Sequence, residues 1–394
     1  MADRRIFLDW NAGAPLRPQA REAMAAVLDE VGNPSSVHAE GRRARRLVED
    51  ARERLATLVR ARPADIVFTA GATEAANTVL TPAAPRHQNP KPLTRLLLGA
   101  SEHVAVLQGH RFGSDAVELV PIDAGGVIDP GALESRVAEL TAEHGIASVM
   151  VALQAANNET GVVQPLAEVT RRLDPLGAIV VCDAAQIAGK LPFDAVSIGA
   201  DVTILSAHKF GGPKGVGAIV YGADHVRPEP LLRGGGQEGR RRAGTENVPA
   251  IVGFAAAAEI AWQEVAAFAA RAAMLRDGLE ADLLAATPNA VIYGERSPRL
   301  PNTTLIGVPR VSAETLVIAL DLAGAAVSSG AACSSGKVGP SHVLAAMGVD
   351  SIQARSAIRI SIGWETTAED LHRFGALWRG VMARIRPNAL SRTA

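Results

Sequence analysis

Short apolar runs alternate with longer stretches of helical spacing through the first two thirds of the chain, and this alternation limits the fold more than any other feature. Runs of four to six apolar residues separated by helices indicate the buried strands of a mostly parallel sheet with helices on both faces. The runs are Ile66 to Thr69, Leu96 to Gly99, Ser148 to Leu153, Ala178 to Cys182, Val202 to Leu205 and Val216 to Tyr221. We therefore expect an α/β fold built on a doubly wound sheet.

The last two of these runs are expected to pair differently from the others. Only a short Gly/Pro loop joins Val202–Leu205 to Val216–Tyr221, which is too short for a crossover helix, so this pair should be antiparallel. Helices are expected over Ala39–Val59 and Glu134–Glu143, and the alanine-rich stretch Ile251–Leu284 is long enough to link two parts of the protein.

The remainder of the chain favours a second, smaller domain of the α+β type. We expect strands around Ala290–Tyr293 and Asn302–Ile306, a helix near Ala313–Ala323 and a last strand at Ala357–Ile362. A chain of 394 residues is too long for one compact core. We therefore predict a large domain at 15–262 and a small domain formed by 1–14 together with 263–394.

Composition excludes several classes of protein. The formal net charge of −1 argues against nucleic acid as the main partner. No run reaches about 18 uninterrupted apolar residues, and the start MADRRIFLDW lacks the apolar core of a signal peptide. Two cysteines, Cys182 and Cys333, cannot build a disulfide framework or a multi-cysteine zinc site. We expect a cytoplasmic enzyme without a metal or membrane partner, in which Cys182 is a buried small apolar residue.

Lys209 is the first candidate for catalysis. In SAHKFGGPKG it follows the apolar stretch Asp201–Leu205 and precedes a glycine-rich turn, so it is expected at the end of a buried strand. A lysine there loses hydration, its pKa falls from about 10.4, and the neutral amine can attack a carbonyl to form a Schiff base. This chemistry indicates pyridoxal phosphate, although a solvated lysine in a turn is the ordinary alternative.

Other strand ends carry residues that suit the same cofactor. Ile66–Thr69 runs into Gly71, Ala72 and Thr73 and then a helix, so backbone N–H groups and a helix dipole can bind phosphate there. Asp183 ends the strand Ala178–Cys182, where a carboxylate can keep a pyridine nitrogen protonated. A plain helix cap is the alternative for each of these two sites.

Two histidines and three amides complete this set. His103 follows another strand end and His208 precedes Lys209, so either can stack on a ring or move protons near neutral pH. Gln186 lies close enough to Asp183 to reach a phenolic oxygen, and the neighbours Asn157 and Asn158 in AANNETG can bind that oxygen or a substrate carboxylate. A structural histidine and a turn-forming asparagine are the ordinary alternatives.

Motifs along nearly the whole chain resemble the class V aminotransferase family of fold-type I pyridoxal phosphate enzymes, and within it the cysteine desulfurases of the NifS/IscS type. They are LDWNAGAP, NPSSVH, FTAGATEAANTV, SEHVAVL, ANNETG, CDAAQ, SAHKFGGPKGVG, RAGTENVPAIVGF, SSGAACSSG and AIRISIG. The resemblance implies a mostly parallel, seven-stranded type of sheet in the large domain, and a homodimer.

The resemblance also implies individual roles. Lys209 is then the Schiff-base lysine, Asp183 the partner of the pyridinium nitrogen and His103 the residue that stacks on the ring. The residues implied near the phenolic oxygen are Gln186 and Asn157. Those implied at the phosphate are Ala72, Thr73, Ser206 and His208, joined by Thr245 from the other subunit. Arg359, with Asn157, is implied to bind the substrate carboxylate.

Cys333 decides the subfamily. It lies in SSGAACSSGKVGPSH, a Gly/Ser/Ala-rich stretch that is typical of an exposed loop, and nearby Lys337 favours the thiolate. The resemblance implies that this loop carries the persulfide cysteine to acceptor proteins. Two departures from the family pattern are Gly13–Ala14, where threonines are common, and Trp364, which can alter the rim of the pocket.

The sequence therefore predicts a cysteine desulfurase that converts L-cysteine to L-alanine and leaves a persulfide on Cys333. The sulfur acceptor, such as an iron–sulfur scaffold or a tRNA or cofactor thiolation partner, is left open. Another class V aminotransferase or a selenocysteine lyase would keep Lys209 and Asp183 without using Cys333. A non-catalytic scaffold is a further alternative, whereas a nicotinamide-binding domain is disfavoured because no G-x-G-x-x-G follows the first strand.

Overall fold

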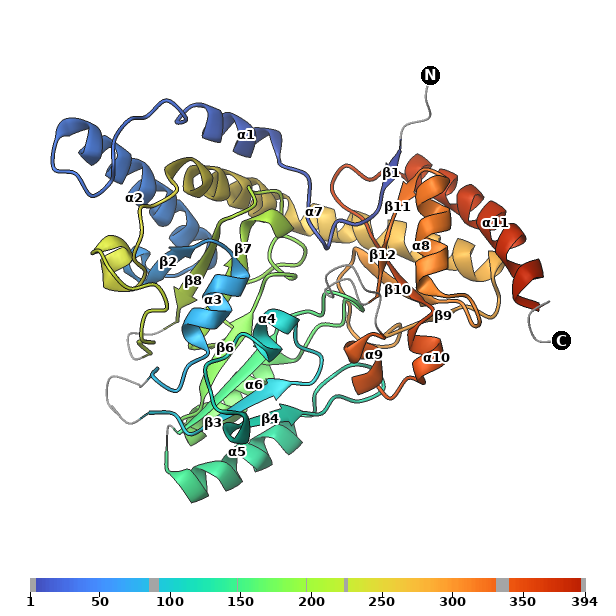
Figure 1. Ribbon diagram of the computed structural model, residues 1–394, viewed down its shortest axis with the longest axis horizontal. Coiled ribbons are helices and arrows are strands. Elements are labelled where there is room, and N and C mark those ends of the chain that lie inside the picture. Colours follow the sequence, from blue (N-terminus) through green and yellow to red (C-terminus); the bar gives the residue numbers. More distant parts are fainter. Residues whose placement is uncertain are drawn as a thin grey trace.

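The computed structural model describes residues 5–84, 92–146, 148–195, 197–222, 226–330 and 340–390, with only the backbone given for 386–390. Figure 1 shows two parts side by side, a larger one built from the first two thirds of the chain and a smaller one from the last third. Both parts contain a sheet covered by helices, as the sequence predicts.

A seven-stranded sheet forms the centre of the larger part. Its order is β2 (Ile66–Thr69), β8 (Gly217–Tyr221), β7 (Val202–Ser206), β6 (Ile179–Asp183), β5 (Val149–Gln154), β3 (Arg95–Gly99) and β4 (Val117–Val120). Strand β8 pairs antiparallel with β2 and β7, and the remaining pairs are parallel. The mostly parallel sheet and the antiparallel β7–β8 pair are thus confirmed, while β4 was not anticipated.

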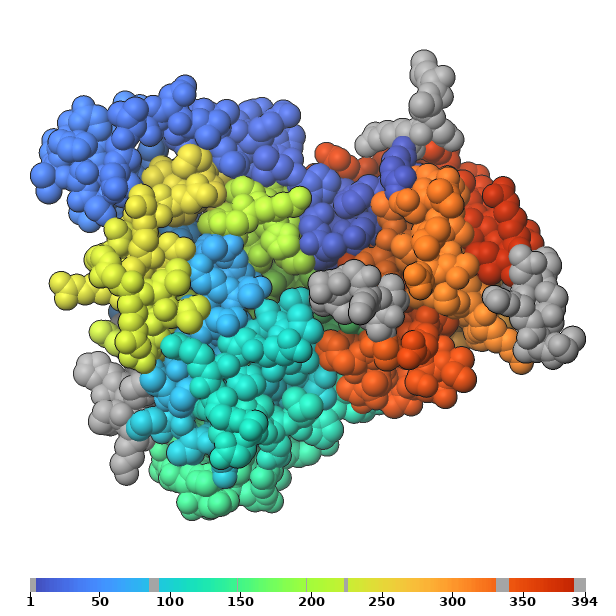
Figure 2. Space-filling model, viewed as in Figure 1, coloured from blue at the N-terminus to red at the C-terminus, as the bar shows by residue number. Residues whose placement is uncertain are grey.

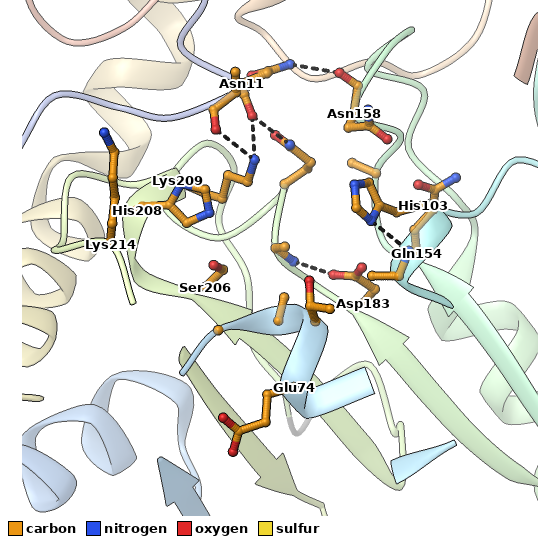
Figure 3. A pocket seen from close by; sticks show the side chains of 18 of the residues that line it. Asn11, Glu74, His103, Gln154, Asn158, Asp183, Ser206, His208, Lys209 and Lys214 are labelled. Carbon is orange, nitrogen blue, oxygen red and sulfur yellow. Dashed lines mark hydrogen bonds between the residues drawn. The ribbon is translucent and has the colours of Figure 1, made fainter. Parts of the chain in front are cut away.

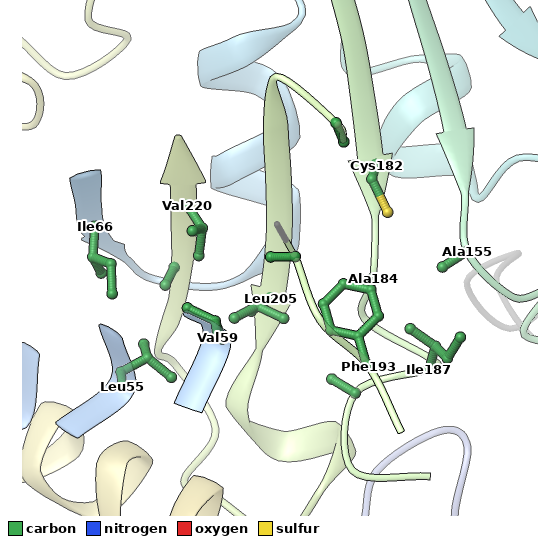
Figure 4. Packing of buried hydrophobic residues seen from close by; sticks show 14 of the residues in the cluster. Leu55, Val59, Ile66, Ala155, Cys182, Ala184, Ile187, Phe193, Leu205 and Val220 are labelled. Carbon is green, nitrogen blue, oxygen red and sulfur yellow. The ribbon is translucent and has the colours of Figure 1, made fainter. Parts of the chain in front are cut away.

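Helices cover both faces of this sheet because its strands are apolar on both sides. On one face pack α2 (Ala39–Val59), α5 (Pro130–His144), α6 (Leu166–Leu173) and the first part of α7 (Val248–Ala286). On the other face pack α3 (Ala72–Val79) and α4 (Val104–Leu107). Figure 4 shows the first face, where Leu55 and Val59 of α2 meet Ile66, Leu205 and Val220 of the strands.

Helix α2 illustrates how the sequence fixes one of these helices. His38 caps its start by accepting a hydrogen bond from the Gly41 N–H, and Arg60 ends it in the left-handed conformation with φ of 56°. Its buried residues recur at helical spacing, including Val48, Ala51 and Leu55. The predicted bounds of this helix are confirmed.

The smaller part has its own sheet and core. Its order is β12 (Ser328–Ser329), β13 (Ala357–Ser361), β10 (Thr303–Gly307) and β9 (Val291–Ile292), with all pairs antiparallel. The helices of this part are α8 (Ala313–Leu322), α9 (His342–Ala346), α10 (Ser351–Ala354) and α11 (Ala368–Leu390). The largest buried side chain of its core is Trp378 of α11.

The N-terminal residues join the smaller part although they precede the large sheet in sequence. Strand β1 (Ile6–Phe7) pairs in parallel with β11 (Ala325–Ala326), and Ile6 and Leu8 belong to the smaller core. Helix α1 (Pro18–Ala25) then packs against α7. Figure 2 shows the dark-blue N-terminal segment lying between the large part and the orange C-terminal part. The domain limits at 15–262 and 263–394 stay a prediction.

Helix α7 belongs to both cores. Its first half, including Ile251 and Phe254, packs under the large sheet, and its second half, including Leu279 and Leu283, packs in the smaller core. Within the described residues it is the one helix long and apolar enough to cross a membrane by length and composition. Half of that apolar window is buried inside the protein, as in the core helix of a globular protein.

Candidate functional site

A cavity of about 660 Å³ opens at the carboxyl ends of the parallel strands, on the side that faces the smaller part. Ligand sites of open α/β sheets form at this edge. The predicted residues that line it are Ala72, Thr73, His103, Asp183, Gln186, Ser206, His208, Lys209 and Arg359. The structure therefore brings together nine of the predicted residues from five separate segments of the chain (Figure 3).

Lys209 lies three residues beyond the end of β7, in a short 3₁₀ turn formed by Ala207–Lys209. Its side chain is half-buried, so it is less enclosed than the sequence prediction of a buried strand end. The Nζ atom donates hydrogen bonds to the backbone oxygens of Asn11, at 2.8 Å, and Ala12, at 3.1 Å. These carbonyls hold the amine at the cavity beside the N-terminal segment (Figure 3).

Asp183 and His103 lie close enough to interact electrostatically. Asp183 ends β6, and its Oδ1 accepts a hydrogen bond of 2.9 Å from the Ala185 N–H. Burial raises the pKa of Asp183, while the Ala185 N–H, His103 and Lys209 act in the opposite direction. Burial lowers the pKa of His103, and Asp183 opposes that effect. A positively charged ring nitrogen beside Asp183 would therefore favour the carboxylate form.

His103 has two roles at once. Its Nδ1 accepts a hydrogen bond of 3.1 Å from the Ala105 N–H and so caps helix α4. Because Nδ1 is the acceptor, the proton of the neutral ring is on Nε2. The ring also lines the cavity. His103 can therefore be a structural helix cap and a residue of the site at the same time.

The start of helix α3 forms one corner of the cavity. Gly71 precedes the helix with φ of 155°, a conformation that side-chain-bearing residues rarely adopt, and Ala72 and Thr73 open the first turn. Their N–H groups have no partners within the helix, so they suit an anion. Ser206 lines the same cavity.

His208 lines the cavity as a neutral group. Burial, helped by the positive charges of Lys209, Lys214 and Lys190, lowers the pKa of His208 to about 4. The imidazole is therefore uncharged at neutral pH and can donate or accept a hydrogen bond there without adding charge.

Asn11 is a site residue that the sequence analysis missed. It is fully buried, and its N–H donates to Ser361 Oγ while its Nδ2 donates to Thr303 Oγ1, both residues of the smaller sheet. Its backbone oxygen accepts from Lys209 Nζ and Gln186 Nε2. Asn11 thus joins the smaller part to the candidate catalytic lysine. A polar residue three positions after the apolar stretch Ile6–Leu8 is the one sequence signal that pointed to it.

Arg359 enters the cavity from β13 of the smaller sheet. It is 2% exposed, donates from Nη1 to the Asn158 backbone oxygen at 2.9 Å and pairs through Nη2 with Asp9 at 2.7 Å. Its Nε is buried and has no hydrogen-bond partner within the described part of the chain. A guanidinium with an unsatisfied donor is suited to a carboxylate ligand.

Of the two candidate asparagines, the one next to this arginine is Asn158 and not Asn157, which the resemblance implies. Asn158 lines the cavity, whereas Asn157 does not. Asn157 donates from Nδ2 to the Ser101 oxygen and accepts at Oδ1 from the N–H groups of Glu159 and Thr160. Its side chain therefore forms a turn, which was the ordinary alternative for this residue.

Two other residues singled out in the sequence, Thr245 and Trp364, do not line this cavity. Thr245 is exposed, and Trp364 packs against Trp10 and under the Arg17 guanidinium. Cys333 and Lys337 lie outside the described residues. The backbone N–H of Ala14 donates to the His208 backbone oxygen at 2.9 Å. The segment Gly13–Ala14 therefore contacts the site through its backbone, although it lacks the threonine hydroxyls that are common in the family.

Further contacts join the two parts just after the segment that contains Cys333. Ser341 Oγ donates to Glu159 Oε2, and His342 Nε2 lies 2.9 Å from the backbone oxygen of Glu102. Glu159 is 1% exposed, and burial raises its pKa to about 7 although Ser341 and Arg359 favour the carboxylate. Cys182, by contrast, is fully buried in β6, and burial raises the pKa of its thiol well above the usual range, as expected for an inert residue.

Together these residues suit a phosphorylated aromatic ring that carries an aldehyde. An amine, a buried carboxylate and an imidazole line the same cavity as the start of α3 with its adjacent hydroxyls. The arginine from the smaller sheet adds a place for a carboxylate group.

Comparisons with known proteins identify similar chains across nearly the full length. Residues 6–374 match the family described as aminotransferase class-V. A curated relative from Archaeoglobus fulgidus, cysteine desulfurase IscS 1, is 36% identical over 96% of this chain and 97% of its own. Cysteine desulfurase IscS from an Anaeromyxobacter species is 40% identical over 93% of this chain and 89% of its own.

Solved structures agree with these sequence matches. A NifS-like protein superimposes with a TM-score of 0.86 and 35% identity, covering 96% of this chain and 99% of its own. A NifS-like protein from Rickettsia africae has a TM-score of 0.85 and 30% identity, covering 96% of this chain and 100% of its own.

Proposed function

The chain belongs to the class-V aminotransferase family, and we propose that it is a cysteine desulfurase that uses pyridoxal 5′-phosphate. One observation carries the proposal: a lysine amine, a buried carboxylate and an open helix start line a single cavity, in a chain whose full-length relatives are named cysteine desulfurases. The net reaction converts L-cysteine to L-alanine and transfers the sulfur to a thiol of the enzyme.

The residues around the cavity fit this cofactor. When bound, pyridoxal phosphate supplies an aldehyde that bonds to an amine and a ring that withdraws electrons from the carbon beside that amine. Asp183 is proposed to accept a hydrogen bond from the protonated ring nitrogen, and His103 to stack on the ring. The proposed phosphate contacts are the N–H groups of Ala72 and Thr73 with Ser206 and His208.

Lys209 is proposed to hold the cofactor and then to move protons. Once the substrate amine has replaced it, its Nζ takes the proton from the substrate α-carbon and later returns a proton to the product. The Asn11 and Ala12 carbonyls keep this amine at the cavity between the two roles. Arg359 is proposed to bind the substrate carboxylate. For Asn157 a direct contact with the ligand is less well supported, because its amide is already engaged in a turn.

Cys333 is proposed as the sulfur acceptor within the enzyme. Its thiolate attacks the substrate sulfur, an S–S bond forms as the C–S bond breaks, and the substrate carbon takes up a proton to become alanine. The products are a persulfide on Cys333 and L-alanine, so atoms and electrons balance without another oxidant.

The protein is further proposed to act as a cytoplasmic homodimer that passes sulfur to an acceptor such as an iron–sulfur scaffold. Thr245 is exposed in this chain and away from its own cavity, which suits a residue offered to the site of a second copy.

The two cysteines of the chain allow a matched test of the nucleophile. Cys333→Ser should bind pyridoxal phosphate with unchanged visible absorbance and lose sulfide release from L-cysteine in the presence of a reductant. The control Cys182→Ala changes a buried thiol on the apolar face of β6 and should keep the activity. If Cys333→Ser releases sulfide at the parental rate, the chain is not a desulfurase of this type. A lyase that frees the sulfur without an enzyme thiol, such as a selenocysteine lyase, would then be favoured, whereas absence of sulfide release from the parent itself would favour another class V aminotransferase.

A further inference from the structure

A second lysine lies beside the site and has no part in the reaction as proposed. Lys190 is 4% exposed, and only five of the 40 Lys and Arg residues of the chain are lysines. Unlike arginine, a lysine side chain can lose its proton when it is buried. No ion pair involves Lys190 within the described residues, which is unusual for a lysine with so little exposure. The position therefore calls for an explanation.

The turn after β6 aims Lys190 back toward the cavity. Gly189 has φ of 71°, and a Cβ added to it would lie 2.8 Å from Phe210 Cβ, so only glycine fits this approach to the turn that carries Lys209. From this backbone position the Lys190 Nζ donates to Asn11 Oδ1 at 2.9 Å and to Gln186 Oε1. Both acceptors are amide oxygens of residues that line the cavity.

The surroundings of Lys190 suit a neutral amine. An ammonium group has three N–H donors, but among the described residues only two acceptors contact Nζ. A neutral amine has two donors, and both are then satisfied. Burial lowers the pKa of Lys190 well below its usual range, and the positive charges of Lys209 and Arg359 add to this effect. His208, the other titratable group that interacts with it, is itself uncharged at neutral pH.

Two donors on Lys190 decide which way two amide groups face. With its oxygen turned to Lys190, Gln186 must present its NH₂ group elsewhere, and one N–H of that group reaches the Asn11 backbone oxygen at 3.0 Å. The second N–H has no acceptor within the described residues, and Gln186 lines the cavity. In the same way, Asn11 turns its Nδ2 to Thr303 Oγ1 because its Oδ1 accepts from Lys190 and Asn302.

We propose that Lys190 is a positioning residue, which orients Gln186 so that an N–H donor faces the bound ligand and holds the Asn11 carbonyl beside Lys209 Nζ. The donor would meet an oxygen on the ring of the ligand, and this part of the inference rests on the proposed function. The hydrogen bonds among Lys190, Gln186 and Asn11 do not depend on it.

The test is a double-mutant cycle with Lys190→Met and Gln186→Leu, which removes each partner and then both. In the protein without cofactor, urea unfolding should show that the two substitutions are not additive, because each breaks the same hydrogen bond. With pyridoxal phosphate, Lys190→Met should weaken cofactor binding about tenfold, the loss of roughly one hydrogen bond. It should also move the pH midpoint of the visible absorbance, and neither effect should persist in the Gln186→Leu background.

Each outcome has a defined meaning. Additive effects in both unfolding and absorbance would overturn the positioning role and leave Lys190 as a packing residue. If the parent binds no pyridoxal phosphate, the proposed function fails, yet unfolding of the cofactor-free proteins still tests the coupling. Should Lys190→Met not fold, Lys190→Gln keeps a neutral NH₂ donor at this position. The pH midpoint of the visible absorbance of Lys190→Gln should lie between those of the parent and Gln186→Leu. A midpoint displaced further from the parent than that of Gln186→Leu would contradict the proposal.

Discussion

The two sides of the cavity are built in different ways. The sheet-edge group, Thr73, His103, Asp183, Ser206 and Lys209, lies at or just beyond the carboxyl ends of strands of one sheet. The junction group, Asp9, Asn11, Asn302, Thr303, Arg359 and Ser361, is joined by hydrogen bonds between the N-terminal segment and the smaller sheet. The first group displays side chains on an already stable scaffold, whereas the second holds two parts of the protein together. Changes in the first should therefore affect chemistry, and changes in the second should also affect stability.

Lys209→Ala should separate chemistry from stability most clearly. We expect alanine formation from L-cysteine to fall at least about a thousandfold, because both the covalent tether and the proton carrier are lost. The free energy of unfolding should change by less than about 1 kcal/mol, since the side chain is half-buried. Alanine analysis and urea unfolding measure the two effects. A large loss of stability would remove the distinction between the two groups.

Asn11→Ala should have the largest effect on stability. It removes one buried hydrogen-bond partner from each of Lys190, Asn302 and Thr303, at a cost of about 4 kcal/mol in the free energy of unfolding. Urea unfolding of the cofactor-free protein measures it. The same substitution at the exposed Asn33 is the control and should cost less than about 1 kcal/mol. Equal losses at the two positions would mean that the junction group contributes no special stability.

Glu159→Gln tests the contact between Glu159 and Ser341 through its pH dependence. The folded-state pKa of about 7 lies above the unfolded value near 4.5, so the folded protein retains a proton that the unfolded chain has released. The free energy of unfolding should therefore fall as pH rises from 4.5 to 7, by about 3 kcal/mol in total, and change little above that. The glutamine variant should lack this slope. Parallel curves for the two proteins at pH 5 to 8 would exclude this titration.

Gly13→Ala should have the smallest effect. A Cβ at this position would lie 3.4 Å from His208 Nδ1, close to ordinary contact, and the backbone there is not in the left-handed region. We expect a loss below about 1 kcal/mol and a cofactor affinity within a few-fold of the parent. Thermal unfolding and absorbance titration measure these. A much larger loss would show that the sheet-edge side of the cavity is as sensitive to packing as the junction.

The sheet-edge group was readable from the sequence because each member follows an apolar run. Lys209, Asp183 and His103 needed only the strand pattern and the rule that parallel strands end at one edge. The strand β4 was missed because its residues are partly exposed and form the edge of the sheet. Helices α6 and α11 were also not anticipated, although the mostly parallel sheet did not depend on them.

The junction group could not be read from the sequence in the same way. Asn11 meets Ser361, 350 positions away, and Lys190 meets Asn11 across 179 positions, so no local pattern predicts either contact. Asn157 and Asn158 are neighbours with the same side chain, and only the turn geometry decides which of them faces the cavity. Resemblance to a family identified Arg359, but not its pairing with Asp9.

The continuity of α7 has a mechanical consequence. A helix of 39 residues is about 58 Å long, and it is embedded in both hydrophobic cores. A sharp hinge within it would break backbone hydrogen bonds along the helix. Any narrowing of the cavity must therefore come from slight bending of α7 or from rotation of the smaller part about the axis of this helix. Large hinge motions of the smaller part against the larger part are ruled out while the helix stays intact.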